Sequence, residues 1–495
     1  MAARQPILVG VGQLTHRAAA PAEVMEPLEL MAEAARRAAA DAGIGLAEID
    51  EITVINCISR HYADPAGFLA ERLGCTPRRT IYTAMGGNSP QWRVNETAER
   101  IARGEVRLAL IAGAEAMAGL ALARKAGVKL TWAAEGHPEM VGDSRWGNNE
   151  VEQRHHAQMP TAVYPLFENA LRAARGWSIA RHREYLGQLC AGLAAVAKDN
   201  PYAWFRDGKS AAEITTVTDA NRLISWPYPK YMNAIIAVDQ AAALLLTDTE
   251  TARRLGIPAE KWVYVTGCGD ATEHWYVSDR VNFSTVPAIR AAGAAALQQA
   301  KLSVGDVDYF DLYSCFPCAV QLGGDMLGVG VDDARPRTVA GGLPYHGGPG
   351  NNYVTHAIAC MVDRLRATPG ARGLVTGVGW YLTKHAVGVY QSAAPQHAFE
   401  RVDPKTTQAV VDAEPHPTLA ESADGDATVE TYTVSHDREG NPAIGIIVAR
   451  LGDGRRCWAN LAQRDVLERS EREELIGAAG RITHDAGSGI NRFDL

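Results

Sequence analysis

The chain has 495 residues, of which 47% are hydrophobic and 21% charged, and its formal net charge is −8. These totals are those of a globular protein with roughly three domains, and the negative net charge argues against nucleic acid as the main partner. No apolar run reaches about 18 residues, so no membrane span is predicted, and without a secretory signal pattern we expect a cytoplasmic protein.

The first predicted elements form a strand, a helix and a second strand. The apolar run at residues 6–12 ends in glycine and predicts a buried strand. The alanine-rich segment 27–42, which stops at Gly43, predicts a helix. Residues 49–57 are rich in β-branched side chains and predict the next strand.

The same order recurs in the second half of the chain. YVTGCG at residues 264–269 repeats the pattern of ILVGVG at 7–12, and a predicted helix at 287–300 follows it. Glycine-asparagine segments at 86–88 and 350–352 each precede a predicted helix and a strand. These coincident repeats indicate a duplication, so we expect the two Gly/Asn loops to face each other across a pseudo-twofold axis.

Composition predicts the domain boundaries. Between the halves, the sequence becomes rich in tryptophan and arginine, which indicates an inserted cap, and a polar Pro/Asp-rich stretch follows the second half. Strand patterns then predict a small β-rich module. The predicted units are a first half at 1–120, a cap at 121–232, a second half at 233–395, a linker at 396–424 and a C-terminal domain at 425–495.

The most unusual stretch is GGLPYHGGPGNNY, residues 341–353. Glycine permits positive φ and close backbone approach, and proline fixes its own φ, so the stretch predicts a tight loop of defined shape. A predicted helix at 354–365 follows, and free N–H groups at its start favour an anion or a polarised carbonyl. We expect this loop to lie near a ligand, although a plain surface turn has the same composition.

The eight cysteines predict neither a disulfide framework nor a metal centre. Only Cys315 and Cys318 are closely spaced, and no second CxxC or histidine pair accompanies them as a zinc site would require. We expect buried thiols and no metal ligands.

Several segments resemble the thiolase superfamily over about residues 5–392. They are IARGEVRLALIAGAEAM, NAIIAVDQAAALLLTD, DLYSCF, GGLPYHGGPGNN and GLVTGVGWYLTKHAVGVY. The resemblance implies an α/β thiolase fold, with duplicated α-β-α-β-α layers and an inserted cap. GGNSPQ, DLYSCFP, GGPGNNY and GWYLTKHA are similar to divergent thiolase-like proteins of type 1, which carry an additional C-terminal domain.

The C-terminal segment resembles small OB-fold proteins that assemble with thiolase-like enzymes, including thiolase-fold aldolases that cleave steroid side chains. We therefore expect a small OB-like β-barrel at the C-terminus. OB barrels often bind nucleic acid, but the acidic total and the absence of a basic-aromatic face disfavour that use here.

The reactive thiolase side chains are replaced in this sequence. The position of the acyl-accepting cysteine falls on Gly87, that of the GHP histidine on Gly348, that of the proton-handling cysteine on Val378, and that of the HDCF histidine on Tyr313. The resemblance therefore implies a coenzyme A thioester as substrate or ligand, no tightly bound cofactor, and no cysteine acyl-enzyme.

Tyr313 and His346 are the candidate acid/base groups. Tyr313 can donate to a thioester carbonyl or exchange a proton if its pKa is lowered from about 10, or it can be a packing residue. His346 lies two positions before the lost histidine and can substitute for it, or it can be a loop histidine bonded to backbone.

Other candidates are weaker. Ser89 would need an aligned base such as His346 or His385 to act as nucleophile, and Cys315 is a candidate reactive group or a structural thiol. Asn88 and Asn352 can donate amide hydrogens to a substrate or cap their helices. The predicted ligand-binding positions are Gly87, Asn88, Gly348, Asn351, Gly379 and His385, and Lys384 either joins them or is solvated.

Three functions follow from these alternatives. The first is an acyl-CoA-processing enzyme that transfers an acyl group or makes or breaks a C–C bond. The second is a retro-aldol lyase that splits a β-hydroxyacyl-CoA. The third is an acyl-CoA or lipid-binding protein without catalysis. The resemblance implies pairing of two copies through the core, and the added C-terminal domain leaves a monomer equally open.

Overall fold

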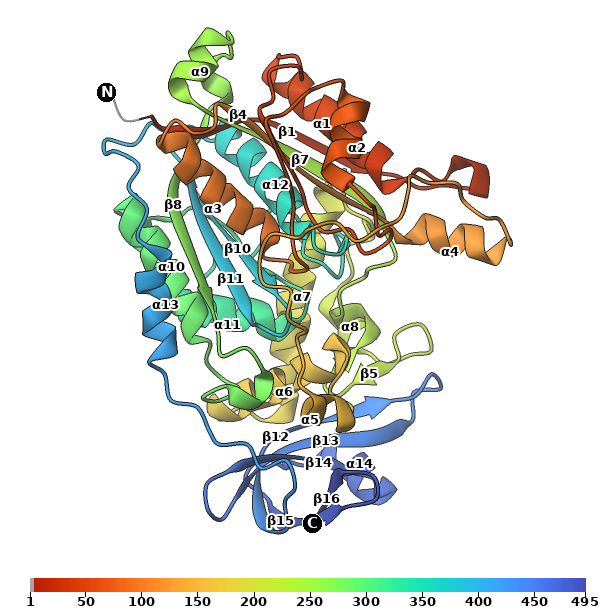
Figure 1. The fold of residues 1–495 in the computed structure, drawn as a ribbon. Helices are drawn as coiled ribbons and strands as arrows, with labels where there is room; N and C mark the ends of the chain where they lie inside the picture. The colour runs from red at the N-terminus through yellow and green to blue at the C-terminus, as the bar shows by residue number, and fades with distance from the viewer. Residues whose placement is uncertain (1–3) are drawn as a thin grey trace.

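The structure, a computed structural model, describes residues 4–495. A layered α/β core forms the upper part of the molecule and a small β-barrel forms the lower part, with the C-terminus in the barrel (Figure 1). No helix among the described residues is long and apolar enough to cross a bilayer.

Nine strands make the central sheet, in the order β3-β2-β4-β7-β1-β8-β11-β10-β9. The two halves meet where β1 and β8 pair antiparallel through Ile7 with Tyr264 and Leu8 with Val263. These are the strands that repeat in sequence, as a pseudo-twofold axis requires. The strands are β1 (Pro6–Thr15), β2 (Glu51–Val54), β3 (Arg79–Tyr82), β4 (Leu108–Ala116), β7 (Asp239–Asp248), β8 (Val263–Thr272), β9 (Tyr309–Asp311), β10 (Arg372–Gly379) and β11 (Lys384–Gln391).

Helices lie between and outside the two half-sheets. Helices α3 (Ser89–Ala102) and α12 (Tyr353–Ala367) contact strands of both halves and form the middle layer (Figure 1). The first half is covered outside by α1 (Pro27–Ala42) and α2 (Pro65–Leu73), with α9 (Thr249–Arg254) beside β7, and the second half by α10 (Pro287–Ala300) and α11 (Pro317–Leu327). The predicted α-β-α-β-α order is confirmed.

The repeated glycines explain how the outer helices pack. A Cβ at Gly12 would overlap the backbone oxygen of Ala34 in α1, and a Cβ at Gly269 would overlap that of Ala292 in α10. The apolar-x-Gly-x-Gly pattern therefore records the close approach of a helix to a strand in each half.

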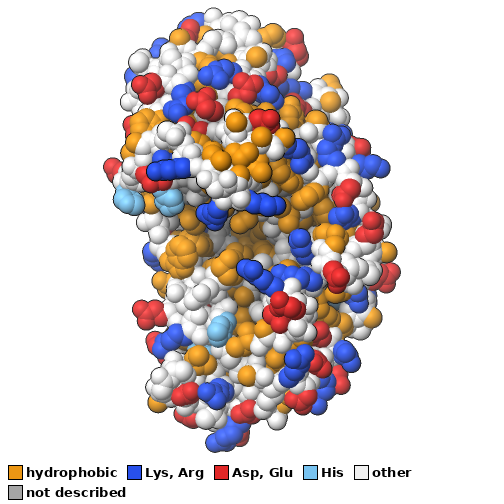
Figure 2. Space-filling model, turned by 90° about the vertical axis from the view of Figure 1, so that its right-hand side faces the viewer, with side chains coloured by type: hydrophobic (Ala, Val, Ile, Leu, Met, Phe, Trp, Pro, Cys, Tyr) orange, Lys and Arg blue, Asp and Glu red, His pale blue; other side chains and the backbone are white. Residues whose placement is uncertain are grey.

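The chain leaves the core between β4 and β7, in the region predicted as a cap at residues 121–232. The elements here are α4 (Met117–Lys125), α5 (Glu150–Arg154), α6 (Pro160–Ala174), α7 (Ile179–Asp199), α8 (Ala211–Thr215), β5 (Leu223–Ser225) and β6 (Tyr228–Pro229). On the face that carries α4, α8 and β5, Figure 2 shows a hollow with hydrophobic side chains inside it and Lys and Arg side chains around it.

The C-terminal domain is a closed five-stranded barrel, as predicted. Its strands close in the order β12-β13-β14-β16-β15-β12, and β5 of the insert joins β12 through Ser225 and Ser435. The elements are β12 (Gly425–His436), β13 (Pro442–Leu451), β14 (Arg456–Leu461), α14 (Arg464–Ser470), β15 (Ala479–Asp485) and β16 (Ile490–Asp494).

The segment predicted as a linker is docked on the core. It contains α13 (Pro404–Asp412), which packs against β8 and α10. Before this helix, the almost fully buried Arg401 forms ion pairs with Glu99 and Asp270. The barrel is therefore joined to the core by a segment with its own buried contacts.

We expect a monomer in solution, because the exposed sheet edge at β3 is blunted. This strand has only four residues, begins with exposed Arg79, and at its end Val141 of the insert bonds to Tyr82 and Ala84. Short, charged and covered edges disfavour strand pairing between copies. Light scattering at micromolar concentration should give about the chain mass of 53.1 kDa; twice that mass would contradict the expectation.

Candidate functional site

Four segments meet between the half-sheets, and we call this meeting point the loop junction. It comprises residues 86–89, 313–316, 346–352 and 378–385. The Gly86 N–H donates to Asn351 Oδ1 at 2.8 Å, so the two Gly/Asn loops are in direct contact as their repeat predicts. A Cβ at Gly377 would lie 2.9 Å from the Asn88 Cα, which shows how closely β10 approaches the start of α3.

Tyr313 fills the space in which a side chain at Gly87 would lie. A Cβ at Gly87 would overlap the Tyr313 hydroxyl and lie 2.6 Å from the Val378 carbonyl oxygen. The Tyr313 N–H donates to Thr376 Oγ1 at 2.8 Å, whereas the hydroxyl has no hydrogen-bond partner among residues 4–495. The tyrosine is 7% exposed, so a phenol with a free hydroxyl occupies the place where a nucleophile would be expected.

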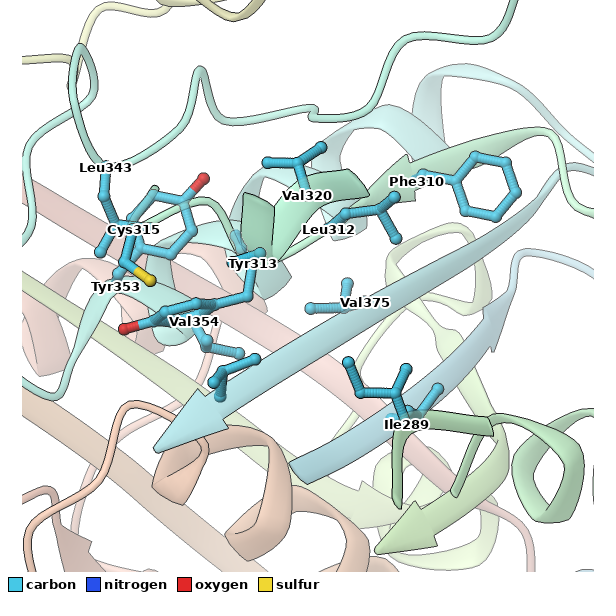
Figure 3. Close-up of a cluster of buried hydrophobic side chains, with 14 of the residues drawn as sticks. Ile289, Phe310, Leu312, Tyr313, Cys315, Val320, Leu343, Tyr353, Val354 and Val375 are labelled. Atoms are coloured by element: carbon cyan, nitrogen blue, oxygen red, sulfur yellow. The ribbon is translucent and has the colours of Figure 1, made fainter. Parts of the chain in front are cut away.

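Cys315 lies beside this phenol. Figure 3 shows the Tyr313 ring, the Cys315 thiol and the Tyr353 ring grouped together. Burial raises the pKa of Cys315 to about 12 and also raises the pKa of Tyr313. Both groups are therefore protonated at neutral pH, and Cys315 lacks the thiolate that a nucleophile needs.

His346 is placed deeper than predicted for an acid/base group. It is fully buried, its Nδ1 lies 3.3 Å from the Gly347 oxygen, and its ring packs against those of Tyr353 and His356. Burial lowers the pKa of His346 to about 4, so its imidazole is neutral. No hydrogen bond or ring–ring contact joins His346 and Tyr313 within the described part of the chain.

The three asparagines of the Gly/Asn loops differ in the hydrogen bonds that their side chains make. Asn352 Nδ2 donates to the Gly113 oxygen at 2.7 Å, and its Oδ1 accepts from Thr355, so this amide is used within the protein. Asn351 Nδ2 donates to the Asn56 oxygen at 3.1 Å. By contrast, Asn88 makes no capping bond and its buried Oδ1 has no partner. Asn88 is thus the asparagine whose side chain remains available.

The serine-histidine pairs predicted as one option are not assembled. Ser89 Oγ donates to the Ala84 oxygen at 3.2 Å, and His385 Nε2 lies 2.8 Å from the Leu382 oxygen. Burial lowers the pKa of His385 to about 3. Neither His346 nor His385 hydrogen-bonds to the Ser89 hydroxyl in the region that the structure describes.

Asn88 and Ser89 face a cleft of about 340 Å³, which we call the Lys384 cleft. Lys384 itself is not solvated: it is 7% exposed and its Nζ donates to the backbone oxygens of Met85 and Asp143. Burial lowers the pKa of this amine to about 8. Further lining residues are Trp92, Asp143, Asp270, His385 and Lys405. From the sequence alone, Lys384 could either line the ligand site or be solvated.

The lowered pKa of Lys384 predicts how the free energy of unfolding changes with pH. Below pH 8 the amine is protonated in the folded and unfolded chain, whereas between about pH 8 and 10.5 only the unfolded chain keeps the proton. Rising pH therefore favours folding through this group. Relative to Lys384→Met, the free energy of unfolding of the unmodified protein should rise by about 2 kcal/mol from pH 7.5 to 10, measured by urea unfolding. Lys129→Met, at an exposed lysine, is the control variant. Parallel pH profiles of the free energy of unfolding for the unmodified protein and Lys384→Met would contradict the prediction.

The turn between β10 and β11 has an unusual backbone. Trp380 and Leu382 have φ values of 54° and 56°, which bulky residues rarely adopt. The buried Arg280 holds this turn by donating to the oxygens of Tyr381 and Leu382 at 3.0 and 2.9 Å. Strained backbone that surrounding contacts maintain is often found at functional sites.

The Gly341–Tyr353 loop also has an outer side. Phe205 N–H donates to the Tyr345 oxygen, and the Gly348 N–H donates to the Ile235 oxygen. Phe205 is 38% exposed and Ile236 is 57% exposed, so apolar surface borders the loop. A cation lies nearby, because the Arg17 guanidinium stacks 4.1 Å from the Trp204 ring.

Comparison with known proteins gives one family match and several structural matches. Residues 406–487 match the model of the thiolase-like protein type 1 additional C-terminal domain. A monomeric SCP2-thiolase-like protein type 1 from Mycobacterium smegmatis is 34% identical, with 99% of each chain covered and a TM-score of 0.85. No match was found among curated proteins.

Two further solved structures are similar in fold only. The Ltp2-ChsH2(DUF35) aldolase is 17% identical, with 79% of this chain and 98% of that chain covered and a TM-score of 0.61. An acetyl-CoA acetyltransferase from Syntrophomonas wolfei is 16% identical, with 79% of this chain and 100% of that chain covered and a TM-score of 0.53.

Proposed function

Because the chain belongs to the SCP2-thiolase-like proteins of type 1, we propose that it acts on a coenzyme A thioester at the loop junction, breaking or forming a C–C bond by aldol chemistry. The observation that carries the proposal is the Tyr313 hydroxyl, which has no hydrogen-bond partner in residues 4–495 and occupies the space beside Gly87. The similarity in fold to the Ltp2-ChsH2(DUF35) aldolase is in keeping with this chemistry.

The groups present favour C–C cleavage over acyl transfer. Acyl transfer through a covalent intermediate needs a nucleophile, but position 87 has no side chain, the Cys315 thiol has a pKa of about 12, and Ser89 has no aligned base. Retro-aldol cleavage needs no covalent intermediate. It needs a proton acceptor for the β-hydroxyl group and a donor for the developing enolate oxygen.

Tyr313 supplies the donor in this proposal. A water molecule accepts the β-hydroxyl proton, the oxygen's electron pair forms the new C=O bond, and the Cα–Cβ bond breaks. The β-carbon thus leaves as a ketone or aldehyde, and the electron pair of the broken bond moves onto the thioester as an enolate. The protonated phenol donates to the enolate oxygen, and a proton then returns to the α-carbon to give the shortened acyl-CoA. A phenol kept protonated by burial suits donation in a site of low polarity.

The outer side of the loop suits the rest of the ligand. The exposed Phe205 and Ile236 offer apolar contacts to an acyl or pantetheine chain. Lys and Arg side chains around the hollow in Figure 2 would attract the phosphates of coenzyme A.

The test is a product analysis. The protein is incubated with β-hydroxyacyl-CoA esters of different chain length and β-branching, and released ketone or aldehyde and shortened acyl-CoA are quantified by mass spectrometry. Release without added coenzyme A supports the proposal. Thiolysis of β-ketoacyl-CoA that depends on free coenzyme A would replace it with acyl transfer, and tight binding of all esters without turnover would replace it with a binding function.

A further inference from the structure

A second cavity lies away from the loop junction, within the inserted segment and on the side of it that packs against the barrel. We call it the insert–barrel cavity. About 50 Å³ of it is open to the centres of water-sized groups, several times what one water molecule needs. Most of its wall is apolar and consists of Ile179, Leu186, Val217, Leu223, Pro227, Pro229 and Met232.

Four residues that line this cavity carry a buried polar atom without a hydrogen bond. One of these atoms, Arg172 Nη2, lies 2.6 Å from Glu474 in an ion pair, so three have no polar partner. These atoms are Asn169 Oδ1, His182 Nδ1 and Trp226 Nε1. Asn169 and His182 are each only 1% exposed. A buried polar group without a hydrogen bond is unfavourable, so the wall of this cavity lacks hydrogen-bond partners that a ligand can supply.

The hydrogen bonds that Asn169 and His182 make away from the cavity determine whether their free atoms donate or accept. Asn169 Nδ2 donates to the Tyr432 oxygen of the barrel at 2.8 Å, which leaves its Oδ1 as an acceptor. His182 Nε2 lies 2.7 Å from Glu168, a buried carboxylate that also accepts from Tyr228 and Gln321. The Trp226 indole can only donate. The cavity therefore offers a donor and an acceptor together.

One of the two arginines that line the cavity is paired with a carboxylate. Arg172 forms an ion pair with Glu474 of the barrel at 2.6 Å, and Arg183 donates to the Thr215 oxygen. Arg183 forms no ion pair within residues 4–495, so the distinction between a neutral and an anionic ligand rests on Asn169 Oδ1, which can only accept, and on the Glu168 carboxylate, which hydrogen-bonds to His182.

The cavity continues into an open groove. Ile179, Arg183, Thr215 and Trp226 line both spaces, and the groove, of about 730 Å³, reaches Glu471 and Arg472 of the barrel. Val217, which is 48% exposed, also lines the cavity. A ligand can thus place one end among the unpartnered groups while the rest lies along the groove.

We propose that the insert–barrel cavity binds a neutral apolar molecule that carries a hydroxyl group, such as an alcohol or a phenol. A hydroxyl oxygen accepts from the Trp226 indole while its hydrogen is donated to Asn169. A carboxylate has no hydrogen for Asn169, and a hydrocarbon satisfies neither group.

The test uses phenol, toluene and benzoate as probes of matched size, with binding measured by ligand-observed NMR and phenol located by crystal soaking. Phenol should bind about tenfold more tightly than toluene and benzoate, the value of one good hydrogen bond. Trp226→Phe should weaken phenol binding about tenfold and leave toluene unchanged.

Val217→Trp is a second variant for the case that Trp226→Phe disturbs the barrel. Position 217 is partly exposed, and a tryptophan side chain there would fill the cavity. Val217→Trp should abolish binding of phenol, whereas Val128→Trp, at a position 46% exposed on another segment, should not. Equal binding of phenol and toluene, phenol binding that survives Val217→Trp, or a soaked crystal with only water in the cavity would each overturn the proposal.

Discussion

Replacement of Tyr313 by phenylalanine is expected to lower kcat/KM for a β-hydroxyacyl-CoA by about 100-fold or more, the usual effect of removing one donor from a developing oxyanion. The ring would remain in place, and the hydroxyl makes no hydrogen bond within residues 4–495 that the protein would lose. Steady-state kinetics of carbonyl release measure the effect, and it should fall on kcat more than on KM because the donor acts mainly in the transition state.

Tyr309→Phe is the matched control for this experiment. Tyr309 lies on β9, the strand that leads to Tyr313, and outside the loop junction. Its hydroxyl forms a hydrogen bond with the Thr368 hydroxyl at 3.2 Å. This variant should keep nearly full activity. If Tyr313→Phe retained the activity of the unmodified protein, the proposed donor role would be wrong even if the enzyme cleaves the substrate.

Installing a cysteine at Gly87 is expected to destabilise the protein by about 3 kcal/mol, the upper end of the usual cost of overpacking. The new Cβ would overlap the Tyr313 hydroxyl and approach the Val378 carbonyl oxygen to 2.6 Å. The thiolase nucleophile therefore cannot be restored by a single substitution. Urea unfolding of Gly87→Cys measures the loss.

A double-mutant cycle identifies the cause of this loss. In the Tyr313→Phe background the hydroxyl clash is absent, so Gly87→Cys should cost about 1 kcal/mol less, although the Val378 oxygen at 2.6 Å and the ring carbon Cζ at 2.8 Å remain. Gly45→Cys is the control, because a Cβ at Gly45 meets no atom within 4 Å. Equal costs in both backgrounds would show that the phenol does not occupy this space.

The layered core was predictable because its determinants are local and repeated. Gly12 and Gly269 belong to the same short pattern in each half, and each admits an outer helix. The helices at 27–42 and 287–300 were predicted at their observed bounds, since proline starts each of them. Short strands separated by turns likewise predicted a β-rich C-terminal module, and the resemblance to small OB-fold proteins predicted that it forms a barrel.

The candidate site was harder to predict, because its contacts join residues far apart in sequence. Asn351 and Asn352 are neighbours, yet one side chain bonds to Gly86 and Asn56 and the other to Gly113. Lys384 follows a glycine turn at the start of a strand, where a solvated lysine has the same pattern. Only the fold brings its amine to the oxygens of Met85 and Asp143.

His346 illustrates the opposite case. A histidine in a glycine-rich loop fits a functional role, but the fold encloses its ring between Tyr353 and His356 and leaves no described hydrogen bond or ring–ring contact with Tyr313. Burial of this kind depends on packing between the halves and has no signal in the loop sequence.

The most direct test of the central claim is the structure of the protein with a non-hydrolysable 2-oxoalkyl analogue of acyl-CoA, in which a methylene group between the sulfur and the carbonyl turns the thioester into a stable ketone. The account predicts the carbonyl oxygen within hydrogen-bond distance, about 3 Å, of the Tyr313 hydroxyl. An analogue bound with its carbonyl in the Lys384 cleft or elsewhere, and with Tyr313 still enclosed, would contradict it.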